Sequence, residues 1–354
     1  MRIALISPPF ISVPPRRYGG TELFIAHLAG GLVERGFDVV LYTNGESTAK
    51  LEKKWLYKEG EWPIKGEVFD SLKDINHTSW AMADAARDCD LIHLNNAPGL
   101  ANSRFFSVPL VYTLHHVHQD ALSTFYEHFP DVHYVTISEF QRQRERMPQI
   151  RTIHHGIDVS LYRLVTKKQS YLSFIGRIAP MKAPHLAIEV AKKAGIPLKI
   201  AGEVQPMFRD YFERRVKPHI DGKFIEFIGP ADLEAKNELL GNSLAMLFPI
   251  QWDEPFGLVM VEAMACGTPV LALPGGSVGE VVANNVSGFV CRSVREMIKR
   301  IPQACNLAPA AIRAYAEQKF STGRMVTEYG ALYREILEDG APLREELRGE
   351  RAVA

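Results

Sequence analysis

The stretch AMLFPIQWDEPFGLVMVEAMACGTPVLA, residues 245–272, decides the fold. It begins with the apolar run 245–248, ends with the apolar run 270–272, and holds an apolar segment of helical character, Gly257–Ala265, between them. Strands of a parallel sheet are buried on both faces and are therefore apolar along their whole length. The stretch thus predicts a strand–helix–strand unit of a parallel sheet.

The same alternation continues on both sides of this unit. Segments 21–35 and 183–194 are among the expected helices. The expected strands are 3–7, 38–42, 91–94, 110–113, 134–137, 172–175, 198–201, 225–228, 245–248 and 270–272. Repeated βα units predict an α/β fold of two Rossmann-like, doubly wound parallel-sheet domains that face a deep cleft. Ligands of such domains bind at the carboxyl ends of the strands.

A change of pattern divides the chain. Residues 154–170, HHGIDVSLYRLVTKKQS, combine a glycine turn with a basic polar stretch before a new strand. We expect an N-terminal domain over 1–158 and a C-terminal domain over 159–315. Residues 316–337 are expected to form a helix that returns to the N-terminal domain, and the charged residues 338–354 form a tail without a core-forming pattern.

The composition excludes several classes of partner. Lys and Arg together number 41, as do Asp and Glu, so the formal net charge is zero and no global field attracts nucleic acid. The four cysteines show no CxxC spacing, which is typical of a reduced cytosolic protein. No apolar run reaches the roughly 18 residues of a membrane span, and no secretory leader is evident. We expect a cytoplasmic protein with at most peripheral membrane contact, of open oligomeric state.

Two glutamates frame the most informative segment, EPFGLVMVE. If a helix begins near Phe256–Gly257, Glu254 lies in the preceding loop and Glu262 in the second helical turn. The free backbone N–H groups at the start of such a helix favour anions. Carboxylates accept hydrogen bonds from sugar hydroxyls. The segment therefore indicates a nucleotide-sugar site, with amides donated by Phe256, Gly257 and Leu258.

Two basic residues follow another predicted strand. In FIGRIAPMK, residues 174–182, a buried strand ends at Gly176, and Arg177 and Lys182 flank the next loop. Arg binds phosphate oxygens as a fork, and Lys adds a point charge. At the carboxyl end of a strand in the same domain as the two glutamates, this pair indicates a diphosphate site.

A glycine pair follows the first strand. Gly19 and Gly20 precede Thr21, which is a candidate N-cap of the next helix. A glycine pair lets the backbone approach a phosphate closely, although a simple turn explains it equally well. The segment contains neither a dinucleotide-binding GxGxxG motif nor a Walker lysine motif.

Three histidines close the strand at 110–113. His115, His116 and His118 are spaced closely enough to suggest zinc. A strand end places His115 and His116 on opposite faces, however, and no Cys or acidic ligand follows at the usual spacing. We therefore predict no metal site and expect His115 in the core or the cleft.

These motifs resemble the retaining glycosyltransferases of family 4, which have the GT-B fold. The C-terminal resemblance is carried by FIGRIAPMKAP, by FPIQWDEPFGLVMVEAMACGTPVLALPGGSVGEVV and by NNVSGFV; YGGTELF, VYTLHH and TISEFQRQR match the N-terminal layout. The resemblance covers about residues 1–337. It implies transfer of a hexosyl group from a nucleotide-diphosphate sugar, UDP-glucose or similar, to a hydroxyl of a sugar, glycolipid or small molecule. It implies no tightly bound cofactor.

The resemblance also implies roles for single residues of the C-terminal half. Arg177 and Lys182 match the basic pair that neutralises the donor diphosphate. Glu262 matches the residue that holds the ribose hydroxyls, and Glu254 matches the one that faces the donor sugar. The amides that approach sugar and phosphate match Phe256, Gly257 and Leu258.

Other roles are implied for positions outside that segment. Gly19 and Gly20 match the N-terminal loop beside the diphosphate. His115 matches a histidine near the C6 hydroxyl and the anomeric centre of the sugar. Gly202 and Glu203, in IAGEV, are expected to line the cleft. Gly279 stands where the family often has proline.

Several alternatives remain open at this stage. Front-face attack by the acceptor is the preferred chemistry, and Glu254 as a covalent nucleophile is the alternative. Another GT-B enzyme, such as a nucleotide-sugar epimerase or a phosphorylase, or a non-catalytic sugar-binding protein would have a similar fold. Trp55, Trp62 and Trp80 fall in or near a charged, loop-like region, 50–67, and form either an acceptor surface or packing contacts. The basic stretch 142–151 is expected to be a solvated helix face or a membrane contact.

Overall fold

The structure is a computed structural model that describes residues 1–16, 19–64 and 66–339. The chain forms two compact units. The first contains Met1–Ile137, Arg142–Gly156 and the chain from Thr322 onward, and the second contains Ser138–Gln141 and Ile157–Ser321. The predicted tail, 338–354, lies almost wholly outside the described residues. No helix of the described residues is long and apolar enough to cross a membrane.

The first unit is built on a seven-stranded parallel sheet. In sheet order its strands are β3 (Glu52–Trp55), β2 (Asp38–Thr43), β1 (Arg2–Ile6), β4 (Leu91–Leu94), β5 (Leu110–Leu114), β6 (His133–Thr136) and β7 (Ile150–Thr152). The order reverses between β1 and β4. That reversal is where the crossing connections separate and leave space for ligands at the carboxyl ends.

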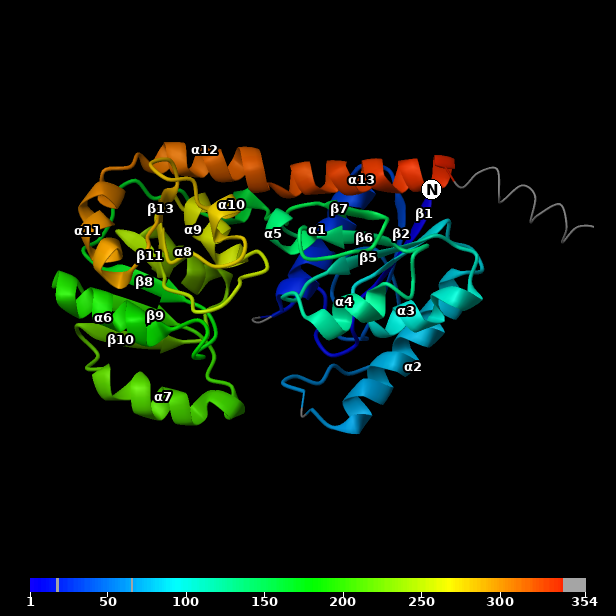
Figure 1. Cartoon of the computed structure of the whole chain (residues 1–354), viewed down its shortest axis with the longest axis horizontal. Helices are drawn as coiled ribbons and strands as arrows, with labels where there is room; N and C mark the ends of the chain where they lie inside the picture. Colours follow the sequence, from blue (N-terminus) through cyan, green and yellow to red (C-terminus); the bar gives the residue numbers. More distant parts are fainter. Residues whose placement is uncertain (17–18, 65, 340–354) are drawn as a thin grey trace, which may run out of the picture. The chain divides into compact units, whose positions relative to one another are not determined.

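Helices cover both faces of this sheet. Its helices are α1 (Gly20–Glu34), α2 (Val68–Ala85), α3 (Pro98–Asn102), α4 (Asp120–Tyr126) and α13 (Thr322–Asp339). Ile3 and Leu5 of β1 belong to a core with α1 and α13, which lie side by side in Figure 1. Ala4 and Ile6 belong to a separate core with α2. Alternate residues of one strand therefore serve opposite faces, as a doubly wound sheet requires.

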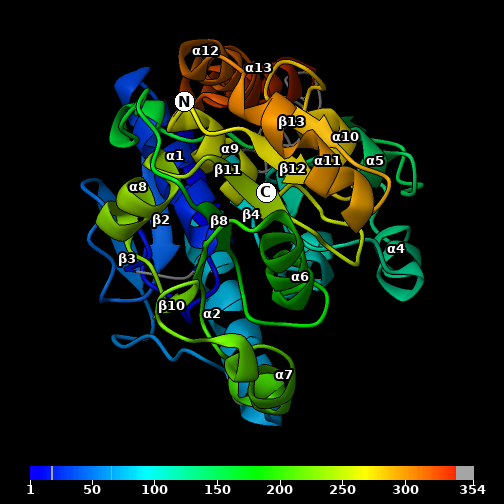
Figure 2. The same ribbon diagram turned by 90° about the vertical axis from the view of Figure 1, so that its left-hand side faces the viewer.

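The second unit contains a six-stranded parallel sheet. In sheet order its strands are β10 (Ile225–Gly229), β9 (Leu198–Ala201), β8 (Leu172–Ile175), β11 (Ala245–Phe248), β12 (Val270–Ala272) and β13 (Gly288–Val290). Its helices are α5 (Glu139–Arg142), α6 (Pro184–Ala194), α7 (Arg209–Arg215), α8 (Leu233–Gly241), α9 (Leu258–Ala265), α10 (Val278–Val281), α11 (Val294–Cys305) and α12 (Pro309–Phe320). α6 and α11 share the main core with the strands, while α9 contacts β11 and β12 and packs against α8 and α12 (Figure 2).

The two doubly wound parallel sheets confirm the predicted α/β class, and every predicted strand is present within one residue of its expected ends. The loop predicted over 50–67 is wrong at β3, where a charged sequence, EKKW, forms a strand. β3 is an edge strand that pairs only with β2, so its side chains need not be apolar. The helix predicted over 142–151 is also wrong, because α5 ends at Arg142 and β7 begins at Ile150.

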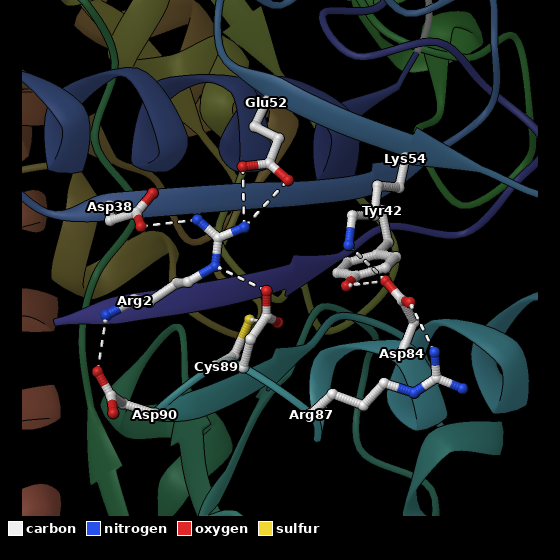
Figure 3. Close-up of polar contacts among 10 residues, drawn as sticks. Arg2, Asp38, Tyr42, Glu52, Lys54, Asp84, Arg87, Cys89 and Asp90 are labelled. Carbon is white, nitrogen blue, oxygen red and sulfur yellow. Dashed lines mark hydrogen bonds and ion pairs between the residues drawn. The ribbon is translucent and has the colours of Figure 1, made fainter.

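The amino-terminal edge of the first sheet is joined by one arginine (Figure 3). The Arg2 guanidinium lies 2.7 Å from Asp38, 2.9 Å from Glu52 and 3.3 Å from Asp88, and its backbone N–H donates to Asp90 at 2.8 Å. These carboxylates raise the pKa of Arg2, chiefly through the hydrogen bonds to Asp38 and Glu52. The cluster holds the starts of four strands together at the edge opposite the one that binds ligands in such folds.

Candidate active site

The carboxyl edge of the second sheet brings two loops together, one after β8 and one after β11. Gln251 in the second loop donates its backbone N–H to the Met181 carbonyl in the first, at 2.8 Å. Beside this bond, the Lys182 ammonium donates to Oε2 of Glu254. Two side chains that the sequence places far apart are thus in direct contact.

Lys182 is a largely buried cation. Its ammonium lies 4.7 Å from the ring centre of Trp252 and 5.7 Å from that of Phe248, so it packs on aromatic faces as well as on Glu254. Burial is the largest influence and lowers the pKa of the Lys182 ammonium, although Glu254 opposes this effect. Arg177, a second positive charge nearby, also lowers it.

Glu254 is the acceptor at the centre of this loop, with only 6% of its surface exposed. Its Oε2 accepts hydrogen bonds from Lys182 and from the indole N–H of Trp252, the latter at 2.8 Å. Trp252 was not among the predicted site residues, because nothing in its residue type predicts a hydrogen bond to a glutamate two positions away.

The backbone of Glu254 is held by the loop that follows β12. Ser277 donates its N–H to the Glu254 carbonyl at 2.9 Å, and Gly276 donates to Oδ1 of Asp253 at 3.1 Å. Gly276 has a φ of 59°, and a Cβ there would lie 2.1 Å from the Glu254 carbonyl oxygen. Only glycine permits this approach, whereas a Cβ at Gly279, the position that departs from the family, would meet nothing within 4 Å.

Arg177 directly follows Gly176, the first residue after β8. Within the part of the chain that the structure describes, no carboxylate forms an ion pair with it. The residue as a whole is half-buried. The site thus contains one cation paired with a glutamate, Lys182, and one available for an anion.

Gly202 has a packing role of its own. A Cβ at Gly202 would lie 1.9 Å from the Gly176 carbonyl, so the ends of β8 and β9 approach each other as only glycine allows. Glu203, the next residue, accepts a backbone hydrogen bond from Ile178 at 3.0 Å. One of its carboxylate oxygens, Oε2, is buried without a hydrogen-bond partner.

The predicted helix start is present. α9 begins at Leu258, and Gly257 precedes it as N-cap with a φ of 82°. Among the described residues, the amides of Gly257 and Leu258 donate no hydrogen bond, so two N–H groups are available at a positive helix end. Phe256 is buried, and its carbonyl accepts from the Ser277 hydroxyl at 2.9 Å.

Glu262, in the second turn of α9, is 1% exposed. Its Oε1 accepts from the Lys236 ammonium at 2.7 Å and from the Tyr162 hydroxyl at 3.0 Å. Its Oε2 is buried and has no hydrogen-bond partner. Burial, with a smaller contribution from Glu262, raises the pKa of Tyr162. Neither Tyr162 nor Lys236 was expected, since they lie on segments that only the folded chain brings to Glu262.

In the first unit, the glycine pair opens α1. Gly19 is the N-cap, with a φ of 142°, and the helix begins at Gly20, so Thr21 as N-cap is wrong. A Cβ at Gly19 would lie 2.8 Å from Oε2 of Glu22, which leaves room only for hydrogen. Burial raises the pKa of the Glu22 carboxyl to about 7. Glu22 was not among the predicted site residues.

His115 directly follows β5. Its Nε2 donates to Oδ1 of Asn95 at 2.9 Å, its ring stacks on His155 at 5.4 Å, and burial lowers its pKa well below the usual value. The ring is therefore neutral at pH 7, with an Nδ1 that has no hydrogen-bond partner. His116 and His118 contact Tyr126 and Glu145 instead, so the three rings take separate partners.

The tryptophans of the first unit have different surroundings. Trp80 packs with ring centres 5.7 Å from Tyr42 and 5.9 Å from His77, which is a core contact. Trp55 and Trp62 are exposed. The packing alternative therefore holds for Trp80, and Trp55 and Trp62 are the two rings left as candidates for an acceptor surface.

Comparisons with known proteins match both halves of the chain. Residues 18–161 match the model for Glycosyltransferase Family 4, and residues 163–318 match that for Glycosyl transferases group 1. The D-inositol 3-phosphate glycosyltransferase of Mycolicibacterium smegmatis is 29% identical over 214 residues, which cover 54% of this chain and 48% of that protein. The chain thus spans about half the length of that relative.

Solved structures share the fold. Sucrose-phosphate synthase from Thermosynechococcus elongatus has a TM-score of 0.81 at 19% identity, covering 96% of this chain and 99% of that one. An Anabaena protein in complex with UDP and glucose has a TM-score of 0.74 at 18% identity, covering 95% and 100%. The chain has the GT-B fold, and its two halves match a glycosyltransferase family 4 domain followed by a group 1 domain.

Proposed function

We propose that the chain transfers a hexosyl group from a nucleotide-diphosphate sugar to a hydroxyl acceptor, with retention of the anomeric configuration. The observation that carries the proposal is the composition of one sheet edge in the second unit. It combines the available cation Arg177, the paired cation Lys182 and the open amides of α9 with two buried glutamates in different surroundings. Cations and helix amides suit a diphosphate, and carboxylates suit hydroxyls.

Lys182 and Glu254 supply an exchange of partners on donor binding. A diphosphate oxygen that takes Lys182 as its donor replaces Glu254, whose Oε2 is then open to a sugar hydroxyl while Trp252 still holds it. The charge that develops on the leaving diphosphate is stabilised by Arg177, Lys182 and the Gly257 and Leu258 amides. Stabilisation of developing charge by prepositioned groups is commonly the largest single contribution to such a rate.

Front-face substitution is the chemistry that fits these groups. The acceptor hydroxyl forms its bond to the anomeric carbon on the face from which the diphosphate leaves, and the leaving phosphate oxygen takes the hydroxyl proton. In the donor complex Oε2 of Glu254 still accepts the indole N–H of Trp252 and also accepts the sugar hydroxyl, and these hydrogen bonds weaken it as a nucleophile. Trapping of a glycosyl–enzyme ester on Glu254 would contradict this step.

UDP-glucose is the first donor to test, and it is supported by the Anabaena structure with UDP and glucose. A panel of UDP-, GDP- and ADP-sugars in a thermal-unfolding assay identifies the donor, since a ligand at about 100 times its Kd adds about 2.7 kcal/mol of stability. Transfer is then measured as nucleoside diphosphate release that requires an added sugar, glycolipid or small-molecule hydroxyl. Release without an acceptor, isomerisation of the donor sugar, or binding with no turnover would overturn the proposal.

A further inference from the structure

The two oxygens of Glu262 have unequal surroundings. Oε1 is saturated by Lys236 and Tyr162, while Oε2 is as deeply buried and has no hydrogen-bond partner. A buried charged oxygen without a partner carries the full free-energy penalty of leaving water. Buried polar atoms are rarely left in this state, and one that persists calls for a ligand or another specific cause.

Both partners of Oε1 are themselves held in place. Asn237, next to Lys236 on α8, accepts from the Arg163 backbone at 2.7 Å and donates to the Leu161 carbonyl at 2.9 Å. These bonds fix the chain on both sides of Tyr162. Tyr162 therefore cannot move away from Glu262 without breaking a backbone attachment to α8.

Arg313 of α12 fixes the same segment to α9. Its guanidinium donates to the Tyr162 carbonyl at 2.6 Å and to the Ala265 carbonyl, at the end of α9, at 2.8 Å. α8, α9, α12 and the Tyr162 segment thus form one hydrogen-bonded frame around Glu262. A carboxylate with one oxygen held by two immobile donors has little freedom to rotate.

We propose that Lys236 and Tyr162 are positioning residues for nucleotide recognition: by saturating Oε1 they hold the Glu262 carboxylate in one orientation and leave Oε2 as the acceptor for the ribose hydroxyls. The inference rests on the proposed function, which places a nucleotide at Glu262. A carboxylate oxygen can accept two hydrogen bonds, so Oε2 alone satisfies a 2′- and a 3′-hydroxyl. The discrimination between a ribonucleotide and its dideoxy form therefore depends on Lys236, which touches no ligand.

The test compares dissociation constants from titration calorimetry. The probes are UDP, GDP and ADP, their 2′,3′-dideoxy forms, and pyrophosphate, which has no ribose. For the nucleotide that binds best, the wild-type protein should bind the dideoxy form at least about tenfold more weakly, as expected for lost hydrogen bonds to a charged group. In Lys236→Met this ratio should fall to about twofold or less, with pyrophosphate affinity unchanged.

Two further variants separate positioning from folding. Tyr162→Phe keeps the shape of the side chain and should lower the same ratio about threefold, as the loss of one hydrogen bond predicts. Lys193→Met, which removes an exposed lysine paired with Glu189 on α6, should leave the ratio at the wild-type value. If Lys236→Met also loses pyrophosphate binding, the inference is judged on the ratio of dideoxynucleotide to ribonucleotide dissociation constants in Tyr162→Phe.

The outcomes distinguish the inference from the proposed function. A full wild-type ratio in Lys236→Met and Tyr162→Phe, with pyrophosphate still bound, overturns the inference and leaves the proposed function standing. Failure of the wild-type protein to bind any of the three nucleotides overturns the proposed function itself, and the inference with it.

Discussion

Lys182 donates a hydrogen bond to Oε2 of Glu254, so each of these two buried charges neutralises the other in the ligand-free protein. The resemblance to family 4 assigns them to different parts of the donor, the diphosphate and the sugar. Because they contact each other, neither side chain is solvated in the ligand-free protein. In the proposed function, a diphosphate that binds Lys182 replaces Glu254 as the partner of its ammonium.

The pairing predicts non-additive stability. Lys182→Met alone should lower the free energy of unfolding by about 3–5 kcal/mol, because it leaves Glu254 buried without its cation. Adding Glu254→Gln should recover about 1–3 kcal/mol of that loss. Urea unfolding of the wild type, both single variants and the double variant measures the coupling. Strictly additive losses would show that the two side chains do not depend on each other.

The two glutamates should give different kinetic losses. Glu262→Gln is expected to raise the donor Kd about tenfold, because a carboxylate acceptor for the ribose becomes a neutral amide. Glu254→Gln should lower kcat about 100-fold while the donor Kd stays within about threefold, because its acceptor role is expected at the sugar. Titration calorimetry and a transfer assay measure both quantities, and Glu213→Gln, an exposed residue paired with Lys217, is the control. Equal loss of donor affinity in both variants would refute this division.

Arg177 should contribute mainly to the transition state. Arg177→Gln removes the cation that has no ion pair among the described residues, and kcat should fall about 100-fold, or about 3 kcal/mol in the barrier. Stability should change little, since no internal partner is lost. The matched control is Arg214→Gln on α7, whose side chain is exposed beside Asp210. An unchanged kcat in Arg177→Gln would remove this residue from the machinery.

Acid should destabilise the first unit through buried His93. Its ring contacts the Tyr333 hydroxyl at 2.7 Å and the Thr113 hydroxyl at 2.8 Å, and burial lowers its pKa to about 3. The folded pKa is below that of the unfolded chain, about 6.5, so the unfolded state binds the proton first as the pH falls. The contribution of neutral His93 to the free energy of unfolding is fully present above about pH 6.5 and is lost as the pH falls toward 3. At pH 5 the loss is about 2 kcal/mol.

His93→Gln isolates this contribution. Burial raises the pKa values of Glu22 and Asp74 to about 7 and about 6, so these two carboxyls stabilise the folded state as the pH falls. The pH dependence of wild-type stability is therefore the sum of opposing contributions. The difference in unfolding free energy between wild type and His93→Gln should therefore shrink from pH 7 to pH 5. A difference that does not change with pH would show that His93 is not the group involved.

The Arg2 cluster should matter for stability and not for catalysis. Arg2→Met leaves the carboxylates of Asp38, Glu52 and Asp88 without their shared cation, and should cost about 1–2 kcal/mol, more than a single exposed pair. Arg87→Met is the control, since Arg87 is 79% exposed and lies 3.9 Å from Asp84. Thermal unfolding measures the change in stability, and the transfer assay measures the change in kcat. A loss of kcat at unchanged stability in Arg2→Met would contradict a purely structural role.

The buried strands were predictable because both faces of each must be apolar. That rule placed every central strand, but it could not find β3, β7 or β13. All three are edge strands, each paired with a single neighbour, and β3 has a charged sequence. Such strands form because their backbone hydrogen-bonds to a neighbouring strand, and their residue types do little to predict them.

The site was predictable where motif and local geometry coincide. Gly257 as a helix start and the two glutamates around it follow from spacing along one segment. The hydrogen-bond partners of those glutamates cannot be predicted from this spacing. Trp252 binds through an indole N–H, and Tyr162 lies 100 residues from Glu262 in the sequence. Contacts of this kind depend on the packing of separate helices, which no local pattern records.

The position of α13 has a consequence for synthesis of the chain. Tyr329 and Tyr333 complete the core of the first unit and bind Thr113 and His93, yet they follow the whole second unit in the sequence. On the ribosome, strands β1 to β7 emerge with one face of their sheet only partly covered, by α1 without α13. The second unit, a nearly continuous segment, can fold first. The first unit therefore remains an incompletely folded intermediate, exposed to chaperones or aggregation, until α13 has been translated.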